Sequence, residues 1–164
     1  MLLRSPTWLW PNLLSIDAPA VAVIWQLLFA RSFHVRVPWP DTVLLAACVW
    51  MIYVADRLLD AIASRPDTAR HFFHRSHFKS FLLCFGLCTL GAFGLLLTKI
   101  DSGVRSAGMP MAAAMAAYFA LVHAAPRAWQ KFWPKELAIA ILFAMGTCLP
   151  VYAEAPGAGP AMLP

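Results

Sequence analysis

Charged residues are scarce in this chain. Asp, Glu, Lys and Arg make up 13% of its 164 residues, whereas 61% are hydrophobic and the mean hydropathy is +0.67. About a quarter of the residues of a soluble globular domain are charged, so the composition excludes an ordinary soluble globule. The few charges cluster between long apolar runs. This arrangement predicts a multi-pass membrane protein.

The chain has four cysteines and no internal repeat. The four cysteines are Cys48, Cys84, Cys88 and Cys148. All of them lie inside apolar runs without the CxxC spacing of a metal or redox site, and buried thiols usually pack as small hydrophobic groups. We therefore expect no disulfide framework. The net charge of +5 is not gathered on a soluble domain, so it indicates membrane topology and anion attraction, not nucleic-acid binding.

Long apolar runs make up most of the sequence. A helix needs about 20 mostly apolar residues to cross the core of a bilayer. Five stretches approach this length: 17–37, 41–63, 80–98, 106–124 and 136–153. We predict an all-α fold, a multi-pass transmembrane helical bundle of about five helices over residues 1–154, with a disordered tail at 155–164. Asp17 and Asp41 are expected to cap the first two helices, and the first span is expected to be retained, not cleaved as a signal sequence.

The loops between these spans differ in positive charge. With the amino terminus in the cytoplasm, nine of the thirteen Lys and Arg residues fall in cytoplasmic segments and four in outer loops. Because cytoplasmic loops are enriched in Lys and Arg, this is the favoured orientation. It places the stretch after the second span on the cytoplasmic side of a membrane, and we expect the bacterial inner membrane.

Two carboxylates end the second span. Asp56 and Asp60 are four residues apart, so on a helix they share one face on consecutive turns. Stacked anions near lipid are unfavourable unless a cation neutralises them, and Mg²⁺ is typically held by one or two carboxylates together with water and substrate phosphates. The donors for diphosphate oxygens would then be Arg57, Arg65, Arg70 and Arg75. The simpler interpretation stays open, in which the two carboxylates face water and pair with Arg57 or Arg70.

The loop that follows contains three regularly spaced histidines. His71, His74 and His77 could bind a transition metal, alone or together with Asp56 and Asp60. Contact with lipid headgroups is the simpler explanation for histidines in an arginine-rich loop at a membrane surface.

The last cytoplasmic loop, "HAAPRAWQKFWPKEL", places Arg127, Lys131 and Lys135 beside aromatic residues. Such a segment is typical of an aromatic belt at the membrane interface. Alternatively, it faces the Asp56 stretch across the mouth of the bundle and binds the same anion.

The stretch "IYVADRLLD" resembles the first aspartate-rich motif, NDxxDxxxD, of the UbiA-type intramembrane prenyltransferases, with Asp56 and Asp60 at its second and third aspartates. "SIDAPAVAVIWQ" is similar to the start of that family's first helix. "YFALVHAAPRAWQKFWPKELAIAILFAMGTCLP" is similar to its fourth helix, basic loop and fifth helix. The resemblance covers almost all of this chain but only about the first half of a family member. Ile52 and Tyr53 stand where the family has Asn and Asp.

This resemblance implies prenyl transfer, in which a prenyl diphosphate bound through Mg²⁺ ionises and a lipophilic acceptor captures the carbocation. Asp56 and Asp60 would hold the Mg²⁺. The basic residues that we expect at the diphosphate are Arg57, Arg70, Arg127 and Lys131. The family's second aspartate-rich motif would have to come from a second subunit or a carboxyl-terminal half. A different function also stays open: a non-catalytic membrane scaffold or partner subunit that retains the fold.

Overall fold

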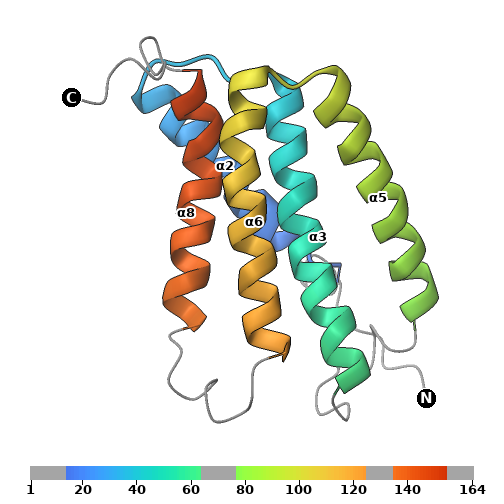
Figure 1. Ribbon diagram of the computed structural model, residues 1–164. Coiled ribbons are helices and arrows are strands. Elements are labelled where there is room, and N and C mark those ends of the chain that lie inside the picture. The colour runs from blue at the N-terminus through green and yellow to red at the C-terminus, as the bar shows by residue number, and fades with distance from the viewer. Residues whose placement is uncertain (1–13, 64–76, 125–134, 155–164) are drawn as a thin grey trace. The chain divides into compact units, whose positions relative to one another are not determined.

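The computed structural model describes residues 14–63, 77–124 and 135–154. Within these ranges the regular structure is entirely α-helical (Figure 1). The helices are α2 (Asp17–Ser32), α3 (Trp39–Ala63), α5 (Phe78–Thr98), α6 (Ser102–Ala124) and α8 (Lys135–Ala153). The all-α prediction is confirmed, and each predicted span coincides with a helix. The first helix ends at Ser32, short of its predicted end at Val37.

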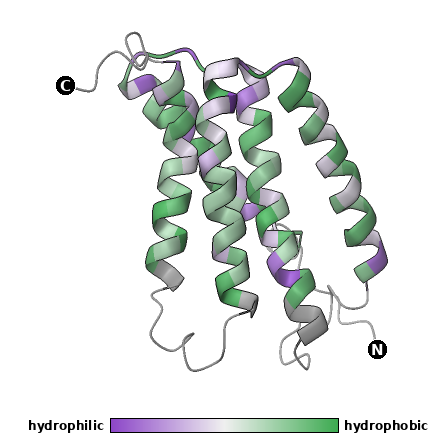
Figure 2. Ribbon diagram, in the orientation of Figure 1, coloured by the Kyte–Doolittle hydropathy of each residue, from purple (hydrophilic) through white to green (hydrophobic). Residues whose placement is uncertain are grey.

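Two helices are long and apolar enough to cross a membrane. They are the Trp39–Leu59 part of α3 and the Phe78–Thr98 helix α5, with 21 residues each. A helix of this length rises about 31 Å, close to the thickness of roughly 30 Å of a bilayer's hydrocarbon core. Figure 2 shows that α5 is hydrophobic along most of its length, with a hydrophilic residue near its amino-terminal end. The apolar part of α8, Leu137–Ala153, is shorter, and five crossings stay a prediction.

The end of α2 is set by a residue in the left-handed conformation. His34 has a φ of 57°. Its N–H donates to the carbonyl of Arg31 at 3.2 Å, and the N–H of Val35 donates to the carbonyl of Ala30 at 2.9 Å. These two bonds form a Schellman motif, in which glycine usually occupies the left-handed position. The motif satisfies carbonyls of the last turn and ends the helix before the apolar run ends.

The two aspartates expected as helix caps lie inside the helices instead. Asp17 is the first residue of α2, and α3 begins at Trp39, which puts Asp41 inside its first turn. A carboxylate there still interacts favourably with the positive end of the helix dipole. The capping prediction was therefore wrong in its position, although the acidic residues do mark both helix starts.

The chain divides into two compact units whose boundaries pass through α2 and α3. Unit 1 comprises Met1–Ile24 and Thr42–Lys99, and unit 2 comprises Trp25–Asp41 and Ile100–Pro164. Unit 1 therefore contains the start of α2, most of α3 and all of α5. Unit 2 contains the end of α2, the first turn of α3, α6 and α8. The single transmembrane domain expected over residues 1–154 stays a prediction, and the expected tail at 155–164 lies outside the described residues.

The core of unit 1 joins α3 to α5. Val54, Leu58 and Phe81 form a buried cluster. The side chains packed around it are Leu14, Trp50, Phe78 and Phe85. Further along the two helices, the Thr89 hydroxyl lies 3.3 Å from the sulfur of Met51. One side of α5 thus packs on α3, and most of its other side chains are exposed.

In unit 2, α6 and α8 pack side by side (Figure 1). A Cβ placed on Gly146 of α8 would lie 3.6 Å from the Met111 methyl group of α6, an ordinary van der Waals distance, so Met111 packs beside this glycine with room for a β-carbon. Small residues favour such close packing between apolar helices. Thr147, which is almost fully buried, donates its hydroxyl to the carbonyl of Ala144 within α8 at 2.9 Å.

Candidate functional site at the end of α3

Asp56 lies on a face of α3 that is buried nearer the amino-terminal end of the helix. At 3.6 residues per turn, Leu45, Val49 and Asp56 fall on one side of α3, and Val54 and Leu58 fall on the opposite side. Leu45 and Val49 are buried, whereas Asp56 is exposed. The carboxylate therefore lies on the same helix face as Leu45 and Val49, at the end of α3 where this face is exposed.

The second carboxylate of the pair belongs to the last turn of α3. The structure describes the backbone of Asp60 as helical, and its side chain lies outside the description. Because the helix is continuous from Asp56 to this position, the four-residue spacing puts both residues on the same face. The helical context on which the pair was predicted is therefore present.

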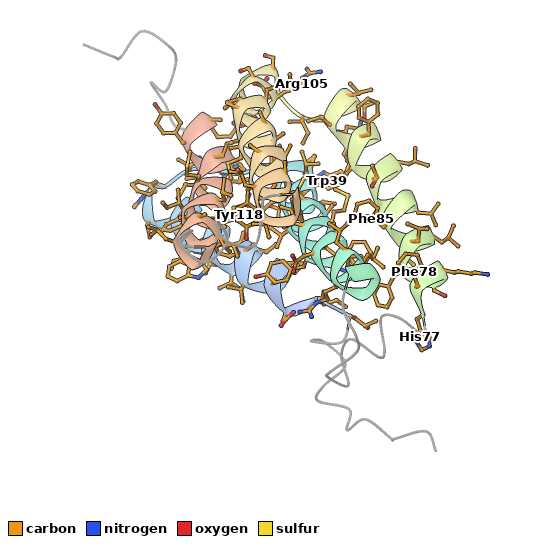
Figure 3. The ribbon with its side chains drawn as sticks, turned by 60° about the horizontal axis from the view of Figure 1, so that its bottom comes forward. Trp39, His77, Phe78, Phe85, Arg105 and Tyr118 are labelled. Atoms are coloured by element: carbon orange, nitrogen blue, oxygen red, sulfur yellow. The ribbon has the colours of Figure 1, made fainter. Side chains whose placement is uncertain are left out.

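Most of the basic and histidine residues expected near this pair lie outside the described residues. They are Arg70, Arg127, Lys131, His71 and His74. His77 lies at the amino-terminal end of α5, where Figure 3 shows its ring pointing away from the helix. In the described part of the chain, no group of three or more His, Cys, Asp or Glu side chains could hold a metal ion. The histidine-metal hypothesis gains no support from His77.

Arg57 contacts the segment that leads into α2. Its Nε–H donates a hydrogen bond of 3.1 Å to the hydroxyl of Ser15, which is fully buried. One part of the guanidinium expected at a diphosphate is thus directed at the protein itself. This contact joins residues 42 positions apart in the chain.

A second hydrogen bond from α3 reaches the neighbouring residue. The indole Nε1–H of Trp50 donates to the carbonyl of Leu14 at 3.0 Å. We call the two bonds, Trp50–Leu14 and Arg57–Ser15, the α2–α3 clamp, because Leu14 and Ser15 lead directly into α2. Sequence reasoning missed three of these four residues. The seven-residue spacing of Trp50 and Arg57, which puts them on one helix face, was the available signal, but it does not say which segment lies opposite.

Aromatic side chains of α5 pack on α3 in the same region. Figure 3 shows Phe78 and Phe85 on the side of α5 that faces α3, and both pack with Phe81 against Val54 and Leu58. The apolar contact attaches α3 to α5, and the clamp attaches it to the segment before α2. Together they make this end of α3 a fixed support for the exposed Asp56.

No family model, curated protein or solved structure matches this chain. The resemblance to UbiA-type prenyltransferases therefore rests on the quoted residues, chiefly "ADRLLD" with Asp56 and Asp60 at the end of an apolar helix.

The chemistry of the described donors suits a hard cation. Asp56 offers an exposed carboxylate, and Mg²⁺ prefers oxygen ligands and usually keeps several waters or phosphate oxygens beside one or two carboxylates. Tyr53, one turn earlier on α3, is partly buried and has a phenol where the family motif has a carboxylate. Asp56 thus offers one oxygen ligand of the kind that Mg²⁺ prefers, and magnesium binding by Asp56 together with Asp60 stays a prediction.

Proposed function

We propose that this chain is an integral membrane protein that binds a prenyl diphosphate at the end of α3 and, as a UbiA-like prenyltransferase or part of one, transfers the prenyl group to a lipophilic acceptor. The observation that carries the proposal is the exposed carboxylate of Asp56 at the end of an apolar helix of membrane-spanning length, with Asp60 one turn further on the same face. The proposal includes a cytoplasmic amino terminus and the bacterial inner membrane.

Each part of the ligand has a chemical counterpart in the chain. Mg²⁺ at Asp56 and Asp60 would neutralise charge on the diphosphate as it leaves. Arg70, Arg127 and Lys131 would donate hydrogen bonds to the diphosphate oxygens and stabilise the charge that develops there. The apolar surfaces of α3 and α5 would receive the isoprenoid tail and keep water from the reacting carbon.

Binding of a prenyl diphosphate tests the proposal directly. The purified chain in lipid nanodiscs is titrated with geranylgeranyl diphosphate, with and without Mg²⁺. We expect binding to require Mg²⁺ and to weaken about tenfold or more when Asp56→Asn and Asp60→Asn are combined. Asp101→Asn, which removes an exposed carboxylate next to the start of α6, is the matched control and should bind as the parent does. Equal affinity in the parent and the double variant would overturn the proposal.

Tyr53 favours a second candidate function. A phenol at this position does not supply the family's first carboxylate, as expected for a scaffold or partner subunit that keeps the fold without catalysis. In that case the chain should copurify with a stable membrane partner, and Asp60→Ala should leave its cellular role intact. Loss of that role in Asp60→Ala would argue for the prenyltransferase.

A further inference from the structure

The α2–α3 clamp fixes how α3 is turned about its own axis. Trp50 and Arg57 are seven residues apart, so their side chains leave the same face of α3 two turns apart. They bond to consecutive residues, Leu14 and Ser15, at 3.0 and 3.1 Å. Both bonds lie off the helix axis on one face, so together they oppose rotation of α3 about that axis.

The acceptor of the Arg57 bond is held in an unfavourable backbone conformation. Ser15 has a φ of 56° and no exposed surface. A non-glycine residue in the left-handed region costs about 1–3 kcal/mol and persists only where its surroundings determine it. Here those surroundings are the two bonds of the clamp and the packing of Leu14 against the Val54–Leu58–Phe81 cluster. The backbone at Ser15 is therefore strained, and in this strained conformation the Ser15 hydroxyl accepts the hydrogen bond from Arg57.

The orientation of α3 matters most for Asp56. Asp56 directly precedes Arg57, so the two side chains leave the helix about 100° apart around its axis. Any rotation of α3 that broke the bond to Ser15 would turn the carboxylate by the same angle. The direction in which the helix face carrying Asp56 and Asp60 points is therefore coupled to the Arg57–Ser15 bond.

We propose that Arg57 is a positioning residue, whose Nε–H bond to Ser15 sets the direction of the Asp56 carboxylate, and not a residue that binds the diphosphate through its charge. The inference rests on the proposed function, in which Asp56 holds a magnesium-bound diphosphate. It departs from the expectation that Arg57 itself contacts this ligand.

Two substitutions separate the hydrogen bond from the charge. In Arg57→Gln the amide nitrogen stands the same number of bonds from the backbone as Nε does, so the donor stays and the charge is lost. In Arg57→Lys the charge stays, but a carbon takes the place of Nε. Ser15→Ala removes the acceptor alone. Lys79→Gln, which removes an exposed positive charge near the start of α5, controls for general electrostatics.

The first measurement is Mg²⁺-dependent binding of geranylgeranyl diphosphate to the full chain in nanodiscs. If Arg57 positions Asp56, Arg57→Gln should bind within about threefold of the parent, whereas Arg57→Lys and Ser15→Ala should weaken binding about tenfold or more. A contact that only stabilises the fold would lower the unfolding temperature without separating Gln from Lys in this way. If Arg57→Gln binds more weakly than Arg57→Lys, the charge is what matters and the inference is overturned.

The second measurement needs no ligand, so it separates failure of the inference from failure of the proposed function. Asp56→Cys is labelled with a charged thiol reagent that does not enter the bilayer, with Arg, Gln or Lys at position 57. We expect the same labelling rate for Arg57 and Arg57→Gln and a rate changed about threefold or more by Arg57→Lys. If the parent binds no prenyl diphosphate but the rates differ in this manner, the proposed function fails and the positioning role stands. Equal rates in all three overturn the positioning role.

Discussion

Replacing Gln26 by methionine should stabilise the protein. Gln26 lies in α2 with no exposed surface, and none of the described residues hydrogen-bonds to its amide oxygen or nitrogen. Ala22 and Ala30, one turn away on either side, are buried on the same face. The amide is thus buried on a helix face that also carries two buried alanines. An unsatisfied buried polar group costs about 1–3 kcal/mol, and a side chain of similar length and volume without polar atoms would avoid this cost.

We expect Gln26→Met to raise the free energy of unfolding by about 1–3 kcal/mol. For a chain of this size, each kcal/mol corresponds to a rise of roughly 2–4 °C in Tm. Thermal unfolding in detergent micelles, followed by circular dichroism, measures the shift. Gln26→Ala separates polarity from volume, because it removes the amide but leaves a cavity and should therefore destabilise the protein.

Leu27→Met is the matched control for the added methionine, because Leu27 is about half exposed on the same helix and should tolerate the change with little effect. A loss of more than about 1 kcal/mol in Gln26→Met, with Leu27→Met unchanged, would refute the reasoning. It would mean that the amide has a hydrogen-bonding partner in the protein or in a bound ligand.

Three further predictions concern packing and the membrane. Leu58→Ala should lower the free energy of unfolding by about 2–5 kcal/mol, measured by chemical denaturation, and a loss below about 1 kcal/mol would contradict a close-packed core in unit 1. Gly146→Ala should stabilise α8 by about 0.5–1 kcal/mol, since its Cβ would meet Met111 at an ordinary 3.6 Å, whereas Gly146→Leu should overpack that contact and lower Tm. Leu90→Lys, at an exposed position near the middle of α5, should cost about 2.5–3.5 kcal/mol of membrane insertion, measured by the fraction of chains recovered in membranes; full insertion would argue that this face does not contact lipid.

The positions of the helices followed from the sequence because their cause is local. A long apolar run has to satisfy its backbone hydrogen bonds internally, and a helix does this without a partner. The runs that became α3 and α5 contain few charges over a membrane-spanning length, so these two helices were the most predictable. The end of α2 was less predictable, because a histidine at position 34 takes the left-handed conformation that usually marks a glycine.

The candidate site was predictable only in part. The shared face of Asp56 and Asp60 follows from helix geometry alone. The partner of Arg57 does not, because Ser15 lies 42 residues away and is brought near only when the segment before α2 packs on α3. Gln26 interrupts an apolar run, and no local signal in the sequence distinguishes a polar side chain that reaches water from one that is buried. The sequence pattern does not predict contacts between segments that are distant along the chain.

The shortness of α2 would have a consequence for any membrane that it crossed. Its 16 residues rise about 24 Å, several ångströms less than the hydrocarbon thickness of a typical bilayer. A helix in this mismatch is accommodated by local thinning of the lipid or by polar flanking groups that reach the headgroups. Arg31 and Arg36 flank its carboxyl-terminal end and are suited to that reach. If α2 crosses the membrane, lipid should be thinnest beside it, and a bilayer of longer-chain lipids should strain this helix before α3 or α5.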